Sequence, residues 1–303
     1  MKETVLNFGP AGALVGIVTR PGATQEGAPI AVVFLNAGVI HRVGPGRLHV
    51  RLARTLAAHG VVCFRFDLPG IGDSRTLGTG GMLLQENLTA VRAALDILER
   101  RGIARQFVIF GLCSGADHAF VAACYDPRIV GIVMVDPTRI FTTWKSHALR
   151  AWRWLVRPSA WLRLVLGHYQ LFRHLAQRVR PALEAPSAIQ QTPASPQVEK
   201  RAVEAALRNF VQRGVRICYL ITGTQRHHYN YRNQLRDAFP GIGLEEITHV
   251  EIMPDAIHTL PREEERVRLE QILLAWLEAG FVPGPAPMPV VVPVPAAGAE
   301  PVA

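Results

Sequence analysis

The sequence predicts an α/β fold with a mostly parallel sheet of eight strands and helices on both faces. Two observations carry this prediction. Short apolar, β-branched runs, typical of strands buried on both faces, alternate with longer segments whose apolar residues recur at three- and four-residue spacings. A repeated strand-then-helix order is typical of a parallel sheet covered by helices. The 303 residues are enough for one large domain of this kind.

Eight segments are expected to form strands. The first two are separated by the turn residues Gly9-Pro10 and are expected to pair antiparallel. The strands in chain order are Thr4–Phe8, Ala13–Thr19, Ile30–Asn36, Val61–Asp67, Gln106–Phe110, Ile129–Val135, Val215–Thr222 and His249–Met253. The helical spacing predicts helices over Arg47–His59, Met82–Arg101, Ser114–Tyr125, Tyr231–Phe239 and Glu263–Ala279.

The alternation is interrupted once, after the sixth predicted strand. Residues 141–206 contain no convincing strand and are rich first in Trp, Leu and Arg, then in Pro and Gln. We expect a helical lid there, over the carboxyl ends of the strands, where open α/β sheets bind ligands. The core is expected at residues 1–140 and 207–282. Repeated prolines cannot continue a helix or pair in a sheet, so residues 283–303 are expected to be a disordered tail.

The composition predicts a soluble, cytoplasmic protein. The chain has no uninterrupted apolar run of about 18 residues, and its N-terminus has no apolar segment or cleavage site of a secretory signal. Its four cysteines are widely spaced, which favours reduced thiols over a disulfide framework, and no CxxC pair indicates zinc. We expect no metal and no organic cofactor, because the sequence has neither a phosphate loop nor the glycine spacing of a dinucleotide site.

The net charge of +9 is concentrated locally. Basic residues from Lys145 to Arg180 are interleaved with tryptophans and leucines, mainly over Ala148–Val179. Such a stretch can lie on an anionic membrane surface or cover a substrate with an acyl chain or acidic sugar. The simpler interpretation is a lid helix with an apolar face on the core and solvated arginines. No motif supports nucleic-acid binding, and the oligomeric state is not predicted.

The most informative motif is the sequence from Gly111 to Gly115, between a predicted strand and a predicted helix. A nucleophile elbow needs small residues two positions before and after the nucleophile, because the chain turns sharply there. Cys113 has glycines at both positions, whereas Ser114 has Leu112 two positions before it. A helix N-terminus after Cys113 would also favour the thiolate. The alternative is an ordinary tight turn that contains a buried cysteine.

Two further segments follow predicted strands. Asn36-Ala37-Gly38-Val39 ends the third strand, and a small-residue loop at this point can donate a backbone N–H to an oxyanion. We therefore expect the N–H groups of Val39 and Ser114 to form an oxyanion hole, although the glycine is equally compatible with a plain turn. His258 lies between the last strand and the last helix, where an imidazole could take up the thiol proton.

These motifs resemble the α/β-hydrolase superfamily, and the resemblance implies its fold. The stretch from Asn36 through Trp144 is similar to serine-aminopeptidase-like hydrolases encoded with bacterial exopolysaccharide and exosortase gene clusters. The residues that carry the likeness are 36–45, 66–74 and 111–116. The family pattern implies an acid shortly after the seventh strand, but residues 223–230 contain no carboxylate. We expect Asp136, at the end of the sixth strand, to replace it.

Asp136 has competing interpretations. It precedes a proline and could be a turn residue, and Asp117 and Asp255 are alternative acids. The sequence thus favours a hydrolase or acyltransferase acting on an ester or thioester of a small molecule, with Cys113, His258 and Asp136 as catalytic residues. The alternative is a catalytically weak accessory or scaffold protein of a polysaccharide biosynthesis or export system, which the missing acid motivates.

Overall fold

The computed structural model describes residues 1–22, 28–78, 83–155 and 196–281. Eight strands form one sheet, in the order β1-β2-β4-β3-β5-β6-β7-β8. β1 and β2 pair antiparallel, β2 and β4 pair antiparallel, and all other neighbours are parallel. The strands are β1 (Lys2–Phe8), β2 (Leu14–Arg20), β3 (Ala28–Phe34), β4 (Val62–Phe66), β5 (Ala104–Leu112), β6 (Ile129–Val135), β7 (Arg216–Thr222) and β8 (Thr248–Met253).

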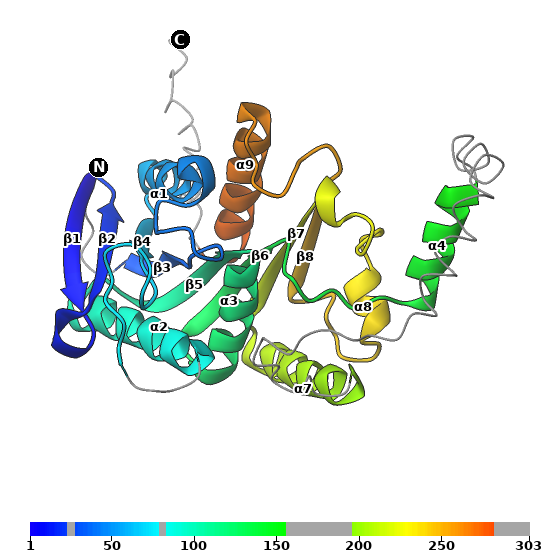
Figure 1. Ribbon diagram of the computed structural model, residues 1–303, viewed down its shortest axis with the longest axis horizontal. Coiled ribbons are helices and arrows are strands. Elements are labelled where there is room, and N and C mark those ends of the chain that lie inside the picture. Colours follow the sequence, from blue (N-terminus) through cyan, green and yellow to red (C-terminus); the bar gives the residue numbers. More distant parts are fainter. Residues whose placement is uncertain (23–27, 79–82, 156–195, 282–303) are drawn as a thin grey trace, which may run out of the picture.

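Helices cover both faces of the sheet, as predicted (Figure 1). α1 and α9 lie on one face, and α2, α3 and α7 lie on the other (Figure 1). The described α-helices are α1 (Leu48–Ala58), α2 (Leu83–Arg100), α3 (Ser114–Tyr125), α4 (Trp144–Leu155), α7 (Pro196–Arg213), α8 (Gln234–Ala238) and α9 (Glu263–Gly280). Three short 3₁₀ segments are η1 (Pro10–Gly12), η2 (Pro45–Arg47) and η3 (Gly223–Gln225). All eight predicted strands and five predicted helices are confirmed, with ends shifted by a few residues.

The sheet separates two hydrophobic cores, because side chains of a strand alternate between its faces. In β3, Ala31 and Val33 belong to the core shared with α2, α3 and α7. Ile30, Val32 and Phe34 belong to the core shared with α1 and α9. Both sets are almost fully buried. This two-sided burial explains why the strands are continuous apolar runs in the sequence.

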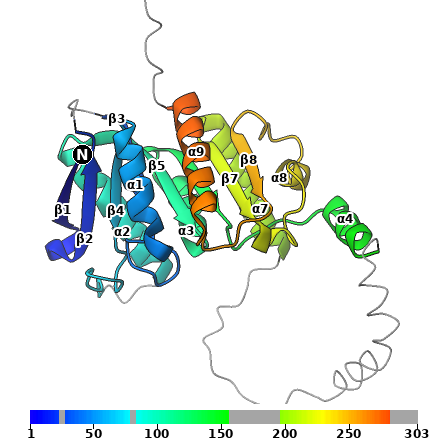
Figure 2. The same ribbon diagram turned by 90° about the horizontal axis from the view of Figure 1, so that it is seen from above.

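The segment expected to be a lid is described only at its two ends. α4 lies beyond α8, away from the layers of the sheet (Figure 2). α7 packs beside α3, and its Leu207 and Phe210 are buried in the core. α7 therefore includes residues of both the expected lid (141–206) and the expected core. Residues 156–195, which hold most of the expected basic lid, and the expected Pro-rich tail lie outside the described residues. No described helix is long and apolar enough to span a membrane.

Candidate active site

The turn between β5 and α3 has the backbone of a nucleophile elbow, with Cys113 at its apex. Cys113 has φ 58° and ψ −126° and directly precedes the first residue of α3. A positive φ is uncommon for a residue with a side chain and is strained. The N–H of Cys113 donates to the carbonyl of Val135 at 2.9 Å, and the N–H of Ala116 donates to the carbonyl of Cys113 at 2.9 Å. These bonds join the turn to β6 and to the helix.

The two flanking glycines are sterically required. A Cβ on Gly111 would lie 2.1 Å from the carbonyl oxygen of Gly115. A Cβ on Gly115 would lie 2.6 Å from the carbonyl oxygen of Asn36. Both contacts are with backbone atoms, which cannot rotate away. The tight turn is therefore centred on Cys113, and Ser114 is the first residue of α3.

The loop after β3 contacts the elbow through Gly38. The N–H of Gly38 donates to Oγ of Ser114 at 3.0 Å. Gly38 has φ 57°, a conformation that favours glycine. Val39, which we predict as an oxyanion donor, is one residue further on and is 89% exposed. The loop N–H that contacts the elbow is that of Gly38, and it is bonded to Ser114.

A buried polar network holds this loop in place. Asn36 donates from Nδ2 to the carbonyl of Ile40 at 2.9 Å and accepts the N–H of Leu68 at 2.8 Å. The carboxylate of Asp67 is fully buried and accepts bonds from the backbone and the guanidinium of Arg42. The loop after β3 is thereby tied to the loop after β4. These contacts give the glycine-rich loop after β4 a structural role.

His258 and Asp136 form a hydrogen-bonded pair. Nδ1 of His258 lies 2.9 Å from Oδ2 of Asp136, within the 2.6 to 3.2 Å range expected of a base and the group that orients it. Asp136 follows β6 and is fully buried, whereas the His258 side chain, in the loop between β8 and α9, is 29% exposed. An imidazole bonded in this way through Nδ1 has its other ring nitrogen free for a proton from a nucleophile.

Two threonines, which the sequence analysis did not identify, position this pair. Thr222, the last residue of β7, donates its N–H to Oδ1 of Asp136 at 2.8 Å and its hydroxyl to Oδ2 at 2.6 Å. The N–H of His258 donates to Oγ1 of Thr224 at 3.1 Å. A single sequence does not show which strands are neighbours. The one available signal for Thr222 is its position at the end of the strand expected beside the strand that Asp136 follows.

Neither alternative acid is paired with His258. Asp117 lies one turn into α3 and accepts a hydrogen bond from the hydroxyl of Thr138. Asp255 contributes its backbone carbonyl to the guanidinium of Arg262. Cys113, Asp136 and His258 follow β5, β6 and β8, so all three lie at the carboxyl edge of the parallel part of the sheet. Among the described residues, no group of three or more His, Cys, Asp or Glu side chains could hold a metal ion.

Comparisons with known proteins agree with this architecture. Residues 32–286 match the model of the alpha/beta hydrolase family, and the chain therefore belongs to that family. No curated protein sequence matches the chain significantly.

Three solved structures illustrate the similarity in fold. The esterase domain of a Rhodothermus marinus protein is 17% identical, with a TM-score of 0.52 over 91% of this chain and 97% of that chain. XC6422 from Xanthomonas campestris, described as an α/β serine hydrolase without a lid, is 14% identical, with a TM-score of 0.52 over 94% and 96%. Est1E from Butyrivibrio proteoclasticus is 14% identical, with a TM-score of 0.52 over 90% and 98%. At these identities the likeness concerns the fold.

Proposed function

We propose that this protein is a hydrolase or acyltransferase that cleaves an ester or thioester through Cys113, with His258 as its base and Asp136 as the acid that orients the base. The observation that carries the proposal is the hydrogen bond between His258 and the buried carboxylate of Asp136. Asp136 directly follows Val135, whose carbonyl accepts the N–H of Cys113 at the apex of the elbow. The three groups follow in the chain order nucleophile, acid, histidine, which is the order of this family.

The reaction follows from these roles. The sulfur of Cys113 attacks the carbonyl carbon while His258 takes the thiol proton, and the carbonyl oxygen becomes an oxyanion. Backbone N–H groups of Ser114 and of the loop at Gly38 and Val39 stabilise that charge. His258 then returns the proton to the leaving alcohol or thiol. Water or an acceptor nucleophile, deprotonated by His258, attacks the acyl-cysteine, releases the acid or new ester and restores the thiol.

The accessory or scaffold alternative is now less well supported than the enzyme. It depended on the lack of a carboxylate after β7, and Asp136 supplies a carboxylate to His258 from the neighbouring strand. A cytoplasmic location, a link to exopolysaccharide clusters and contact of the basic segment with an anionic membrane remain predictions from the sequence.

A panel of p-nitrophenyl esters and acyl thioesters tests the proposal. We expect turnover by the wild-type protein, loss of turnover in Cys113→Ala, and a loss on the order of 10²-fold or more in His258→Ala. Ser114→Ala keeps its backbone N–H and should remain active. Circular dichroism checks that each variant is folded. An active Cys113→Ala protein together with an inactive Ser114→Ala protein would overturn the assignment of the nucleophile, and unchanged turnover in His258→Ala would remove the base.

A further inference from the structure

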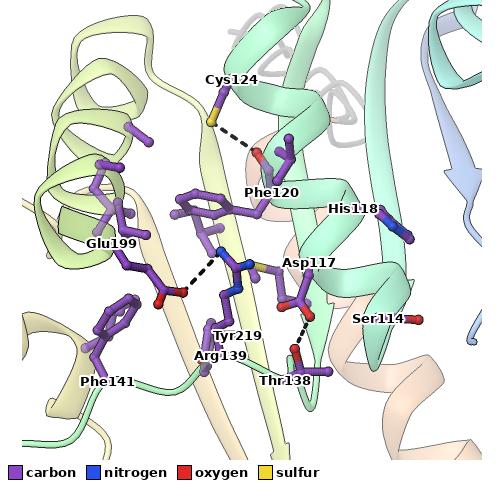
Figure 3. A pocket seen from close by; sticks show the side chains of 18 of the residues that line it. Ser114, Asp117, His118, Phe120, Cys124, Thr138, Arg139, Phe141, Glu199 and Tyr219 are labelled. Atoms are coloured by element: carbon purple, nitrogen blue, oxygen red, sulfur yellow. Dashed lines mark hydrogen bonds and ion pairs between the residues drawn. The ribbon is translucent and has the colours of Figure 1, made fainter. Parts of the chain in front are cut away.

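A cavity of about 610 Å³ lies between α3 and α7, next to the elbow (Figure 3). This volume is within the range of small-molecule sites. Ser114 lines one end of the cavity and Cys124 lies toward the other end of α3 (Figure 3). The catalytic roles proposed above do not use this space. Ser114 follows Cys113 in the chain, and its Oγ accepts the N–H of Gly38 from the loop after β3 at 3.0 Å, so this end of the cavity adjoins the elbow.

The shape of the cavity follows from the two helices. The lining residues on α3 share one broad face of the helix, and they are Ser114, Asp117, His118, Phe120, Val121, Cys124 and Tyr125. On α7 the lining residues include Ala202 and Ala206, whose small side chains leave room beside α3. From Ser114 to Tyr125 the helix advances about 16 Å. The cavity is therefore elongated and runs away from the elbow.

Most of the wall carries no charge. Met134 and Ile217 contribute apolar surface from the sheet, and burial raises the pKa of Tyr219 well above its ordinary value, so its hydroxyl stays neutral. Burial also lowers the pKa of His118, which favours the neutral imidazole. The charged lining groups are Asp117, beside Thr138, and the ion pair of Arg139 with Glu199 at 3.2 Å (Figure 3). Asp117 disfavours an anionic ligand near the elbow end.

We propose that this cavity binds the acyl chain of the substrate, and that the enzyme prefers uncharged, unbranched acyl groups of medium length. The proposal rests on the function proposed above. An extended hydrocarbon chain advances about 1.25 Å per carbon, so the space along α3 accommodates about ten to twelve carbons. The carbonyl lies at the elbow, and the chain lies between α3 and α7. Burial of each methylene should raise kcat/KM about fourfold until the cavity is filled.

The test compares two neighbouring alanines of α7. Ala206 is half-buried and lines the cavity, whereas Ala205 is exposed and is not a lining residue. Ala206→Phe fills the space with a ring, and Ala205→Phe adds the same side chain to the same helix without entering it. Both variants are assayed with p-nitrophenyl acetate, butyrate, octanoate and decanoate.

In the wild-type protein and in Ala205→Phe, kcat/KM should rise with chain length from acetate to decanoate. Ala206→Phe should still turn over acetate, which also shows that it is folded. Its ratio of kcat/KM for decanoate to kcat/KM for butyrate should lie on the order of tenfold or more below the wild-type ratio. If the wild-type protein turns over the esters without any dependence on chain length, or if both variants behave alike, the acyl-chain proposal is wrong while the proposed function stands.

A binding assay separates the two proposals if no ester is turned over. The neutral fluorophore N-phenyl-1-naphthylamine is bound to the protein and displaced with 1-decanol. Binding and displacement that Ala206→Phe weakens and Ala205→Phe does not would support the cavity as a site for apolar chains even though the proposed function had failed. No binding, or equal binding by both variants, would overturn the cavity proposal as well.

Discussion

Thr222 donates two hydrogen bonds to the carboxylate of Asp136, one from its backbone N–H to Oδ1 at 2.8 Å and one from its hydroxyl to Oδ2 at 2.6 Å. Oδ2 also lies 2.9 Å from Nδ1 of His258. Three hydrogen bonds from two residues thus fix the orientation of one fully buried carboxylate. Its geometry is therefore suited to holding the imidazole in one tautomer and one position.

The first prediction concerns this tautomer. In Asp136→Asn an amide replaces the carboxylate, and an NH₂ facing Nδ1 would favour the tautomer that carries its proton on Nε2. The imidazole could not then accept the thiol proton, and we expect kcat to fall on the order of 10²-fold with little change in KM. Steady-state kinetics measures both. Asp96→Asn, which alters a half-buried ion pair with Arg128, is the matched control. Equal kcat values for the two variants would remove Asp136 from the mechanism.

The second prediction separates the hydroxyl of Thr222 from its backbone. Thr222→Val keeps the shape and the N–H but removes the hydrogen bond to Oδ2, whereas Thr222→Ser keeps the hydroxyl. Because a bond to a carboxylate contributes more than an ordinary hydrogen bond, we expect kcat of the valine variant to fall by about tenfold at unchanged KM. The serine variant should recover most of this loss. If serine and valine variants lose kcat equally, the hydroxyl does not position the acid.

The third prediction concerns the loop after β3. Asp67 is fully buried, and the guanidinium of Arg42 pairs with it and with Asp73. Arg42→Ala removes the partner of a buried charge, which should lower the free energy of unfolding by about 3 kcal/mol. Arg208→Ala breaks an exposed pair with Glu204 and should cost no more than about 0.5 kcal/mol. Urea denaturation measures both changes, and similar losses would show that the pair with Asp67 does not stabilise the loop.

The strands and the elbow could be predicted because their physical causes are local. A strand buried on both faces is a continuous apolar run, and the steric need for Gly111 and Gly115 is visible from their spacing around Cys113. The role of Asp136 could be predicted because the loop after the seventh strand has no carboxylate, and Asp136 is the carboxylate at the end of the neighbouring sixth strand. Each of these inferences uses residues that are close in the sequence or strands that are adjacent in a known topology.

The remaining features depend on contacts between distant segments. The bond from Gly38 to Ser114 spans 76 positions, and the bonds from Thr222 to Asp136 span 86. Nothing in the local pattern around Gly38 distinguishes its N–H from that of Val39. The cavity between α3 and α7 likewise depends on how α7 packs against α3, and the first part of α7 lies in the segment expected to be a lid.

The fourth prediction concerns His49, which is fully buried beside Phe34 and Phe110. Burial, with a smaller effect of the charge on Arg65, lowers its pKa from 6.5 to about 3. Between these values the unfolded chain binds a proton that the folded protein excludes, so stability falls as pH decreases from about 6.5 toward 3. This cost is absent above about pH 7.

The His49→Leu variant removes this linkage. Relative to the variant, the wild-type protein should lose about 2 kcal/mol of unfolding free energy between pH 7.5 and pH 5.0. Urea denaturation at a series of pH values measures the difference, and effects of the carboxylates common to both proteins cancel. A difference that does not change with pH would show that His49 binds its proton equally well in the folded protein.

The most direct test of the proposed chemistry is to locate the acyl group during turnover. The wild-type protein is mixed with p-nitrophenyl acetate, quenched with acid within the first turnovers, digested, and mapped by mass spectrometry. We predict one acetyl group on Cys113, bound as a thioester that neutral hydroxylamine removes, and no acetyl group at this position in Cys113→Ala. Turnover accompanied by acetylation of Ser114, or by no acetylated residue at the elbow, would contradict the assignment of Cys113 as the nucleophile.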